Sequence, residues 1–462
     1  MSFRLPGRLT RVAAAIAVVA VFAGCTDFLK ATNPSAIEAK DLESPLYINL
    51  MVNGVIGEYQ QIVDDMALRS GVFGDELFNN HGFFEEREID KRNIIPENGT
   101  WGLFYGPLQR SRFLADSVAG RLKVLRGDSA AFDLRIARVL AYGAASYDLL
   151  AEYLCTIPVN GSVPYSPEDI VKTFVVPRAN EAITIATAYR GATANTNLQA
   201  AADSIIFFAR VTAARSLLYI NDKAAARTFA TQVPPVFEFR AYYSAQNGRE
   251  VNAFQNAAAG SPWVSLEPKS KRLNDPRIPH SVLPNGVQSL ASGNADTVTL
   301  NGVRTIGAFS PKSPLMFSTY DGTVTGTSFS LGCAVPEAGG ACAPPSFIKV
   351  ATGLEAQYIV AEADGAVAST LAFVNARRAV GLQAAVTLSG AALLGELREQ
   401  RRRDLFLDGH RLGDMRRYLK YDKIDNFPRG PYPGSISGET YSDASCFPLT
   451  LAEIAGNPNV PR

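Results

Sequence analysis

The sequence lacks the motifs that would indicate catalysis. Its three histidines, His81, His280 and His410, are too widely spaced to form a metal-binding pattern. It has no Gly-x-Ser-x-Gly nucleophile motif and no glycine-rich loop of the kind that holds phosphate groups. We therefore predict a protein that is not an enzyme and that uses no metal or cofactor.

Two pairs of adjacent carboxylates, Asp64-Asp65 and Glu85-Glu86, are the remaining candidates for acid–base chemistry. A glycosidase needs two carboxylates at a defined separation in space, which adjacency in the sequence does not supply. We interpret both pairs as solvated charge on helix surfaces.

A surplus of positive charge is also lacking, because 45 lysines and arginines are matched by 44 aspartates and glutamates. Proteins that bind nucleic acid carry a basic surface that attracts phosphate groups. We expect no nucleic acid among the partners of this protein.

The only long apolar run lies near the N-terminus and is too short to span a membrane as a helix. Three arginines precede it, and small residues follow it, as in a secretory signal peptide. The end of the run, Ala23-Gly24-Cys25, resembles the lipobox of bacterial lipoproteins, in which the cysteine is acylated. We expect residues 1–24 to be removed, which leaves 42 basic against 44 acidic residues, and Cys25 to carry a lipid anchor.

Four cysteines remain after Cys25, in a compartment that permits disulfides. Cys333 and Cys342 flank a loop rich in glycine, alanine and proline, and we predict a local bridge between them. The sequence leaves open whether Cys155 and Cys446 pair with each other or stay buried as thiols.

Hydrophobic periodicity divides the rest of the chain into three regions. Residues from about 42 to 233 show helical patterns, such as the apolar stripe through Ile205, Phe208 and Leu217. Residues 236–347 contain many turn signals and short β-type runs, so we expect a loop-rich region with minor β structure. Helical patterns return from residue 348. The fold class predicted is mainly α, with tetratricopeptide-like helix pairs, although an ordinary helical bundle fits the periodicity as well.

Several segments, taken in order, resemble the SusD/RagB family of nutrient-binding outer-membrane lipoproteins. No single match is specific, but together they cover nearly the whole chain after residue 24. The matching segments are Asp27-Phe28-Leu29 with Asn33-Pro34, Trp101 with Phe104, Tyr105 and Leu108, "YDLLAEYLCTIPV", "FARVTAARSLLYI", "YIVAEA", Val374-Asn375-Ala376-Arg377, "EQRRRDLFLDGHRLGDMRRY", and Pro448 with Glu453 and Asn457-Pro458-Asn459.

The resemblance implies a SusD-like helical region at 25–235, a loop-rich ligand region at 236–347 and a C-terminal helical region at 348–462. It implies a lipoprotein on the outer membrane, at the cell surface, that binds a nutrient and delivers it to a SusC-like TonB-dependent transporter. The nutrient that the resemblance favours is an oligosaccharide.

Sugar rings stack on aromatic side chains, while amides and carboxylates bind their hydroxyl groups. Two stretches offer such residues, and we expect them to line the ligand site. The first is "GDELFNNHGFFEER", which contains Asp75 and Asn79. The second is the loop-rich region, which also contains Tyr242 and Tyr243. The candidate ligand residues are Asn80, His81, Phe83, Phe84, Trp263 and Tyr320. Trp101 is expected in the core.

Two other functions are compatible with the sequence. One is a tetratricopeptide-type adaptor lipoprotein that binds other proteins during envelope assembly, and the other is an envelope hydrolase. A peptide-binding groove without sugar binding would favour the first, and turnover of a substrate would favour the second.

The segment Leu397–Leu419 is unusually rich in arginine and could bind an anionic partner or stabilise the fold. Its charges alternate at helical spacing, and each exposed ion pair contributes only about 0–1 kcal/mol. We hypothesise a structural cluster, with Arg411 paired to Asp414 within one helical turn and the helix ending at Asp408-Gly409.

Overall fold

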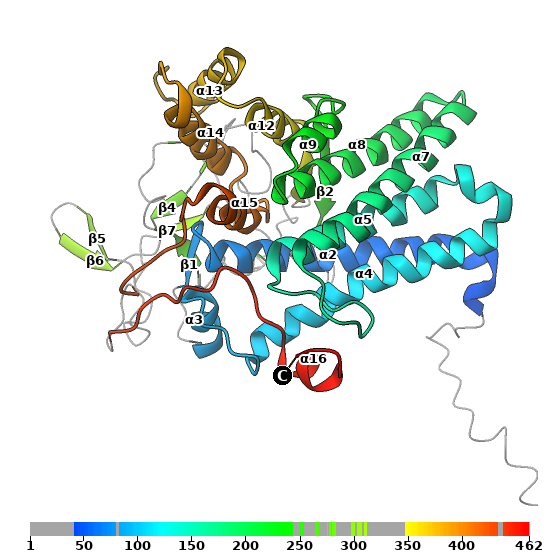
Figure 1. Cartoon of the computed structure of the whole chain (residues 1–462), viewed down its shortest axis with the longest axis horizontal. Helices are drawn as coiled ribbons and strands as arrows, with labels where there is room; N and C mark the ends of the chain where they lie inside the picture. The colour runs from blue at the N-terminus through cyan, green and yellow to red at the C-terminus, as the bar shows by residue number, and fades with distance from the viewer. Residues whose placement is uncertain are drawn as a thin grey trace, which may run out of the picture. The chain divides into compact units, whose positions relative to one another are not determined.

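Helices dominate the part of the chain that the structure, a computed structural model, describes (Figure 1). The residues described are 41–79, 83–243, 250, 252–253, 264–267, 275, 277–278, 280–282, 297–300, 303–306, 309–311, 347–432 and 438–461. The longer helices are α2 (Ile48–Phe73), α4 (Gly99–Arg126), α5 (Leu134–Tyr153), α7 (Val176–Ala192), α8 (Thr196–Tyr219), α12 (Gly353–Asp364), α13 (Ala368–Val380) and α14 (Gly390–Asp404). The mainly α prediction is confirmed.

Shorter elements connect these helices. The short helices are α3 (Phe84–Asp90), α6 (Pro167–Ile170), α9 (Lys223–Ala230), α15 (Arg411–Arg417) and α16 (Leu451–Gly456). Two π-helical turns, η4 (Val171–Val175) and η7 (Tyr418–Asp422), follow α6 and α15 directly. Contacts divide the chain into residues 1–48 and residues 49–462. In the first unit, the described residues form the short helices Asp41–Glu43 and Pro45–Tyr47.

Helices that follow one another in the sequence pack side by side. α4 packs on α5, α5 on α7, α7 on α8, and α8 on α9, which in turn contacts α12. This serial packing is the arrangement of tetratricopeptide-like helix pairs.

The packing of α5 follows from its small residues. Its N-terminus is capped by Asp133, whose side chain accepts a hydrogen bond from the N–H of Arg135. A Cβ atom at Gly143 would lie 3.2 Å from the Cβ of Ala115 on α4, so the two helices approach each other closely. Four alanines of α5 are also buried, namely Ala137, Ala141, Ala144 and Ala145.

Four two-stranded antiparallel sheets account for the strands described, in pairs β1–β3, β2–β8, β4–β7 and β5–β6. Their bounds are β1 (Leu77–Asn79), β2 (Glu238–Tyr242), β3 (Val264–Leu266), β4 (His280–Val282), β5 (Thr297–Leu300), β6 (Val303–Ile306), β7 (Phe309–Pro311) and β8 (Phe347–Thr352). The predicted loop-rich region therefore carries minor β structure.

The pair β2–β8 lies where the loop-rich region leaves and rejoins the helices. Glu238 lies opposite Thr352, and Tyr242 lies opposite Phe347. Gly353 donates its N–H to the carbonyl of Phe237 at 2.8 Å, and a Cβ atom there would lie 2.1 Å from the carbonyl oxygen of Pro234. The domain boundaries near residues 236 and 347 stay a prediction, which this pairing favours.

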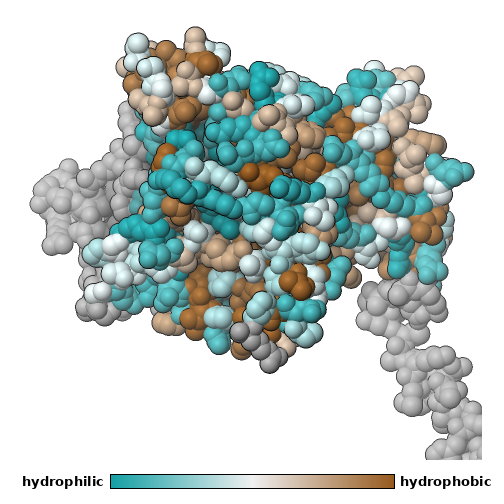
Figure 2. All heavy atoms as spheres, in the orientation of Figure 1, coloured by the Kyte–Doolittle hydropathy of each residue, from teal (hydrophilic) through white to brown (hydrophobic). Residues whose placement is uncertain are grey.

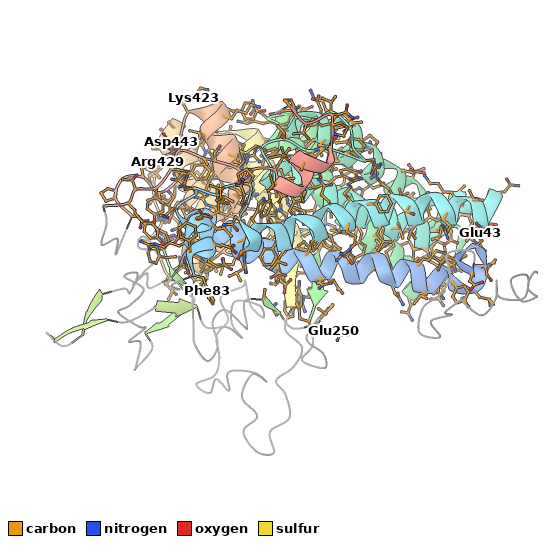
Figure 3. The ribbon with its side chains drawn as sticks, turned by 90° about the horizontal axis from the view of Figure 1, so that it is seen from below. Glu43, Phe83, Glu250, Lys423, Arg429 and Asp443 are labelled. Carbon is orange, nitrogen blue, oxygen red and sulfur yellow. A yellow bond between two sulfur atoms is a disulfide. The ribbon has the colours of Figure 1, made fainter. Side chains whose placement is uncertain are left out.

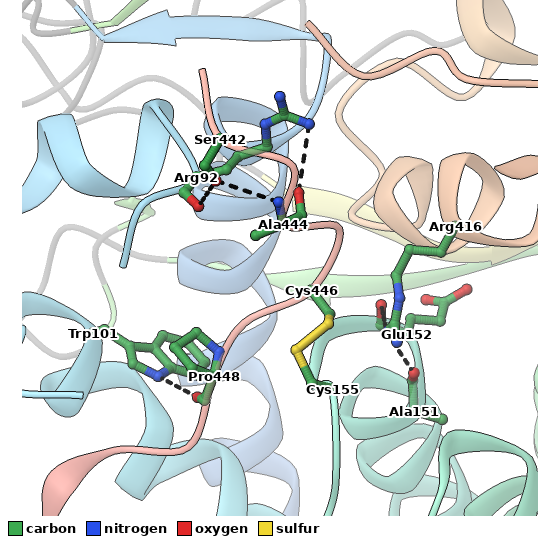
Figure 4. Close-up of a disulfide and its surroundings, with 10 residues drawn as sticks. All are labelled: Arg92, Trp101, Ala151, Glu152, Cys155, Arg416, Ser442, Ala444, Cys446 and Pro448. Atoms are coloured by element: carbon green, nitrogen blue, oxygen red, sulfur yellow. Dashed lines mark hydrogen bonds between the residues drawn. A yellow bond between two sulfur atoms is a disulfide. The ribbon is translucent and has the colours of Figure 1, made fainter. Parts of the chain in front are cut away.

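The C-terminal segment crosses back over the N-terminal helices. Cys446 forms a disulfide with Cys155, which lies two residues beyond α5 (Figure 4). The indole N–H of Trp101 donates to the carbonyl of Pro448 at 2.9 Å, and Trp101 stacks on Phe447 with 4.5 Å between ring centroids. Trp101 is fully buried, as predicted for a core residue.

Helix α14 ends earlier than the sequence analysis expected. Its last residue is Asp404, and the turn that follows places both Leu407 and Gly409 at positive φ. A residue at positive φ cannot continue a right-handed helix, so the helix has to end before Leu407. The side chain of Asp404 accepts two hydrogen bonds from Arg377 and one from Arg277.

Hydrophilic side chains cover most of the face seen in Figure 2, and hydrophobic ones form separate patches there. Among the residues searched, no helix combines the length and the apolar character needed to cross a membrane.

Candidate ligand-binding site

The strand pair β1–β3 joins the two stretches that were singled out for ligand binding. Asn79 at the end of β1 lies opposite Val264 at the start of β3. In the sequence, Asn80 and His81 follow Asn79, and Trp263 precedes Val264. The pairing therefore fixes the backbone to which both predicted binding stretches are attached, although they are far apart in the sequence.

Helix α3 follows β1, and buried polar contacts fix its position. The Asp90 carboxylate accepts hydrogen bonds from the N–H of Asn79 at 2.8 Å and from the Tyr432 hydroxyl at 2.7 Å. Burial raises the pKa of Asp90 to about 7. Arg69 on α2 pairs with Glu86 at 2.7 Å. These contacts make α3 a rigid support, on which binding residues are held more precisely than on a free loop.

Phe83 and Phe84 lie at the N-terminus of this support and point outward. Their exposed fractions are 66% and 65%, and Figure 3 shows Phe83 at the outer edge of the side chains drawn. Phe83 is the N-cap residue, with an extended backbone at φ −67° and ψ 124°. Large exposed apolar side chains that are adjacent mark interaction surfaces more often than isolated ones do. The two rings can stack on the apolar face of a ligand.

Other polar and aromatic residues of the two stretches are part of the interior. Asp75 is buried and accepts two hydrogen bonds from Arg411. Asn79 is buried within β1, and Tyr243 is buried with its hydroxyl bonded to the carbonyl of Gln60. Tyr242 is exposed. Asp75, Asn79 and Tyr243 thus serve the scaffold and do not face a ligand.

Several predicted residues lie outside the described part of the chain. They are Cys25, Asn80, His81, Trp263, Tyr320, Cys333 and Cys342. The ligand roles of Asn80, His81, Trp263 and Tyr320, the lipid on Cys25 and the bridge between Cys333 and Cys342 stay predictions. The disulfide between Cys155 and Cys446 resolves the alternative that the sequence left open.

The interpretation of the two carboxylate pairs as solvated helix charge was wrong for Asp64 and Glu86, which are buried, whereas Asp65 and Glu85 are partly exposed. Asp64 is buried, and its carboxylate accepts a hydrogen bond from the N–H of Ala253 at 2.7 Å. Glu85 caps the N-terminus of α4, because it accepts the N–H groups of Gly99 and Thr100. These bonds, with the Thr100 hydroxyl first, lower the pKa of Glu85. Both pairs have structural roles.

The arginine-rich segment is a buried ion-pair network. The Arg411 guanidinium donates two hydrogen bonds to Asp75, at 2.7 and 2.6 Å. Asp414 accepts bonds from Arg401 at 2.6 Å and Arg417 at 2.9 Å, which hold its pKa well below its usual range. The expected pairing of Arg411 with Asp414 was wrong, because Arg411 reaches a carboxylate 336 residues away. These contacts support the structural hypothesis.

A second buried network contains a residue set that sequence reasoning missed. Side-chain atoms of Asp148, Glu152 and His410 lie within 4.8 Å of one another. Arg215 already pairs with Asp148 at 3.0 Å, and His410 Nδ1 lies 2.5 Å from Glu152. A cation bound to Asp148 would therefore lie against a guanidinium, and we interpret the trio as part of the core. The spacing of Asp148 and Glu152 on α5 was a possible signal, but nothing in the sequence indicated His410 as their neighbour.

Comparison with known proteins is informative at the level of structure. No family model and no curated protein matches the sequence. A SusD superfamily protein from Bacteroides vulgatus is 14% identical with a TM-score of 0.61, and the match covers 90% of this chain and 99% of that one. The chain has the SusD fold.

Two other structures with the SusD fold are named for sugars. A SusD-like carbohydrate binding protein from Bacteroides fragilis is 15% identical with a TM-score of 0.59, over 91% of this chain and 99% of that one. Surface glycan-binding protein A from Bacteroides thetaiotaomicron, in complex with laminarihexaose, is 13% identical with a TM-score of 0.59. That match covers 90% of this chain and 98% of the other.

Proposed function

We propose that this protein binds an oligosaccharide at the cell surface and passes it unchanged to a SusC-like TonB-dependent transporter. The observation that carries the proposal is the exposed pair Phe83 and Phe84 on a rigid support, at the point where two binding stretches are joined. The SusD fold, which the chain shares with a protein solved in complex with laminarihexaose, supports a sugar ligand.

The role proposed for each part of the site follows from its chemistry. The rings of Phe83 and Phe84 stack on sugar faces, with Trp263 and Tyr320 as further stacking residues. Asn80 and His81 bind sugar hydroxyl groups. No step of covalent chemistry is proposed, since the task of the site is to hold a ligand and release it.

The anchoring part of the proposal rests on Cys25. A diacylated or triacylated cysteine would hold the protein stably at the outer membrane, because two or more acyl chains are needed for lasting attachment. Replacement of Cys25 by serine should release the protein from the membrane fraction. Unchanged membrane attachment in this variant would contradict a lipid anchor at Cys25.

Binding can be tested by affinity electrophoresis through gels that contain single polysaccharides, with laminarin as the first. The variant Phe83→Ala/Phe84→Ala should lose retardation, because each stacking ring that contributes 1–2 kcal/mol changes affinity by about 5–30-fold. The matched control is Phe113→Ala, which removes a phenylalanine with an exposed fraction of 53% on α4.

A double variant that keeps its melting temperature and its retardation would refute the site. A protein that binds no polysaccharide in a broad panel would refute the sugar ligand. Delivery is a separate question, which can be tested by co-purification of the full chain with a TonB-dependent transporter from the native outer membrane.

A further inference from the structure

A pocket lies beside the disulfide and shares no residue with the phenylalanine site. Its volume is about 350 Å³. The chain segments that line it are far apart in the sequence: the residue Cys155 after α5, then α6, α8, α15, the turn η7 and the segment at Ser445. The lining side chains used below are Cys155, Glu168, Tyr219, Arg416, Lys420 and Tyr421.

The charges in this pocket do not cancel. Lys420 pairs with Glu168, which also accepts a hydrogen bond from the Tyr421 hydroxyl at 3.1 Å. Arg417, at the edge of the pocket, is neutralised by Glu362 and Asp414. Within the described chain, Arg416 has no carboxylate at ion-pair distance. The pocket therefore carries one net positive charge, at Arg416.

The guanidinium of Arg416 is held in position by hydrogen bonds to backbone carbonyls of α5. Its Nη1 donates to the carbonyl oxygens of Ala151 at 3.0 Å and Glu152 at 2.7 Å, at the C-terminus of α5 (Figure 4). The carbonyls of a last helical turn carry about half a negative charge, which offsets only part of the guanidinium charge. Nε and Nη2 donate to no other described residue, and together they form the edge that binds a carboxylate through two parallel hydrogen bonds.

The aromatic and backbone features of the pocket also favour a ligand. Cζ of Arg416 lies 5.7 Å from the ring centroid of Tyr219, and Tyr421 also lines the pocket. Lys420 and Tyr421 are carried by η7, and Glu168 lies on α6, directly before η4. Single π-helical turns are rare and often occur at functional sites. One of them, η7, carries residues that line this pocket.

We propose that this pocket binds an oxyanion-bearing small molecule, and that a sugar carboxylate, as in a uronic acid, is the ligand that fits it. The carboxylate would bind the free edge of Arg416, and the sugar ring would pack against Tyr421, while Tyr219 supports the guanidinium. The site is independent of the proposed phenylalanine site and would stand if that site failed.

The test is calorimetric titration of the full chain with digalacturonate, inorganic phosphate and maltose. Ser445 lines the pocket, so Ser445→Glu introduces a repelling charge without removing the bonds of Arg416. Ser445→Gln is its control of equal size. Arg416→Gln removes the positive charge, and its control is Arg210→Gln, since Arg210 likewise donates to a backbone carbonyl, that of Gln232.

Digalacturonate should bind and maltose should not bind at this pocket. Ser445→Glu and Arg416→Gln should weaken digalacturonate at least tenfold, while both controls and Phe83→Ala/Phe84→Ala should leave its affinity unchanged. Binding of phosphate alone, lost in Ser445→Glu, would confirm the oxyanion site and refute the sugar carboxylate. Failure of both anions to bind, or equal binding to Ser445→Glu and Ser445→Gln, would overturn the proposal.

Discussion

Replacement of Arg411 by methionine should destabilise the protein without first affecting ligand binding. Arg411 and Asp75 are both buried, and two hydrogen bonds join them. Removal of one partner of a buried ion pair costs about 3–5 kcal/mol, because the other buried charge loses the hydrogen bonds that offset its desolvation. Unfolding of a unit of about 400 residues has an entropy near 0.9 kcal/mol/K, so the melting temperature should fall by about 3–6 °C.

A double-mutant cycle distinguishes this reasoning from a simple loss of packing. Arg411→Met and Asp75→Asn should each be destabilising, but the double variant should lose less than their sum, by about 2 kcal/mol, since no buried charge is left unpaired. The measurements are thermal unfolding followed by circular dichroism, and glycan affinity of each folded variant. Additive effects would refute the pairing argument. A variant of Arg411 with an unchanged melting temperature and lost glycan affinity would refute the structural role of the cluster.

Three further predictions concern stability. Cys155→Ser/Cys446→Ser should lower the free energy of unfolding by about 2–5 kcal/mol, because the disulfide closes a loop with a sequence separation of 291. Equal urea midpoints for the variant and the oxidised protein would contradict this prediction. Burial raises the pKa of Glu76 to about 8, so its contribution to stability should be present below about pH 4.5 and be lost as pH rises through 8. Glu76→Gln should flatten the pH dependence of the melting temperature over this range, and an identical profile would refute it. Gly353→Ala should lower the free energy of unfolding by several kcal/mol, since its Cβ would lie 2.1 Å from the carbonyl oxygen of Pro234. Chemical denaturation measures this change, and an unchanged midpoint would contradict the close contact.

Local periodicity was sufficient to predict the helical frame. The stripe through Ile205, Phe208 and Leu217 on α8 is buried, because a 3.6-residue repeat fixes which side of a helix faces its neighbours. The glycine-, proline- and asparagine-rich stretches likewise predicted the loop-rich region, where the described strands are no longer than six residues.

Pairing over long distances could not be predicted in the same way. The spacing of Arg411 and Asp414 suggested a local ion pair. In the fold, Arg411 instead pairs with Asp75, which lies in the turn before β1. Glu85 has the sequence environment of a helix surface, yet it caps a different helix. One sequence contains no information on which of several compatible carboxylates will lie next to a given cation.

The candidate site was predictable only in part. The choice of Phe83 and Phe84 rested on residue type and position, and both are exposed as a ligand site requires. The junction of their stretch with the segment at Trp263 depends on the β1–β3 register, which two three-residue strands do not reveal in the sequence. Short strands have too few residues for the alternation that identifies them.

The antiparallel contact between β2 and β8 has a consequence for evolution and for protein engineering. Since Tyr242 lies opposite Phe347 in this pair, the two ends of the intervening chain segment lie side by side. The entropy of closing a loop rises only slowly with its length, so a change of length between these strands should cost little stability, provided that β3, which pairs with β1, and Arg277, which donates to Asp404, are kept. A replacement segment joined at these two strands would have to keep those contacts with the helices, while the length of the rest of the segment could vary.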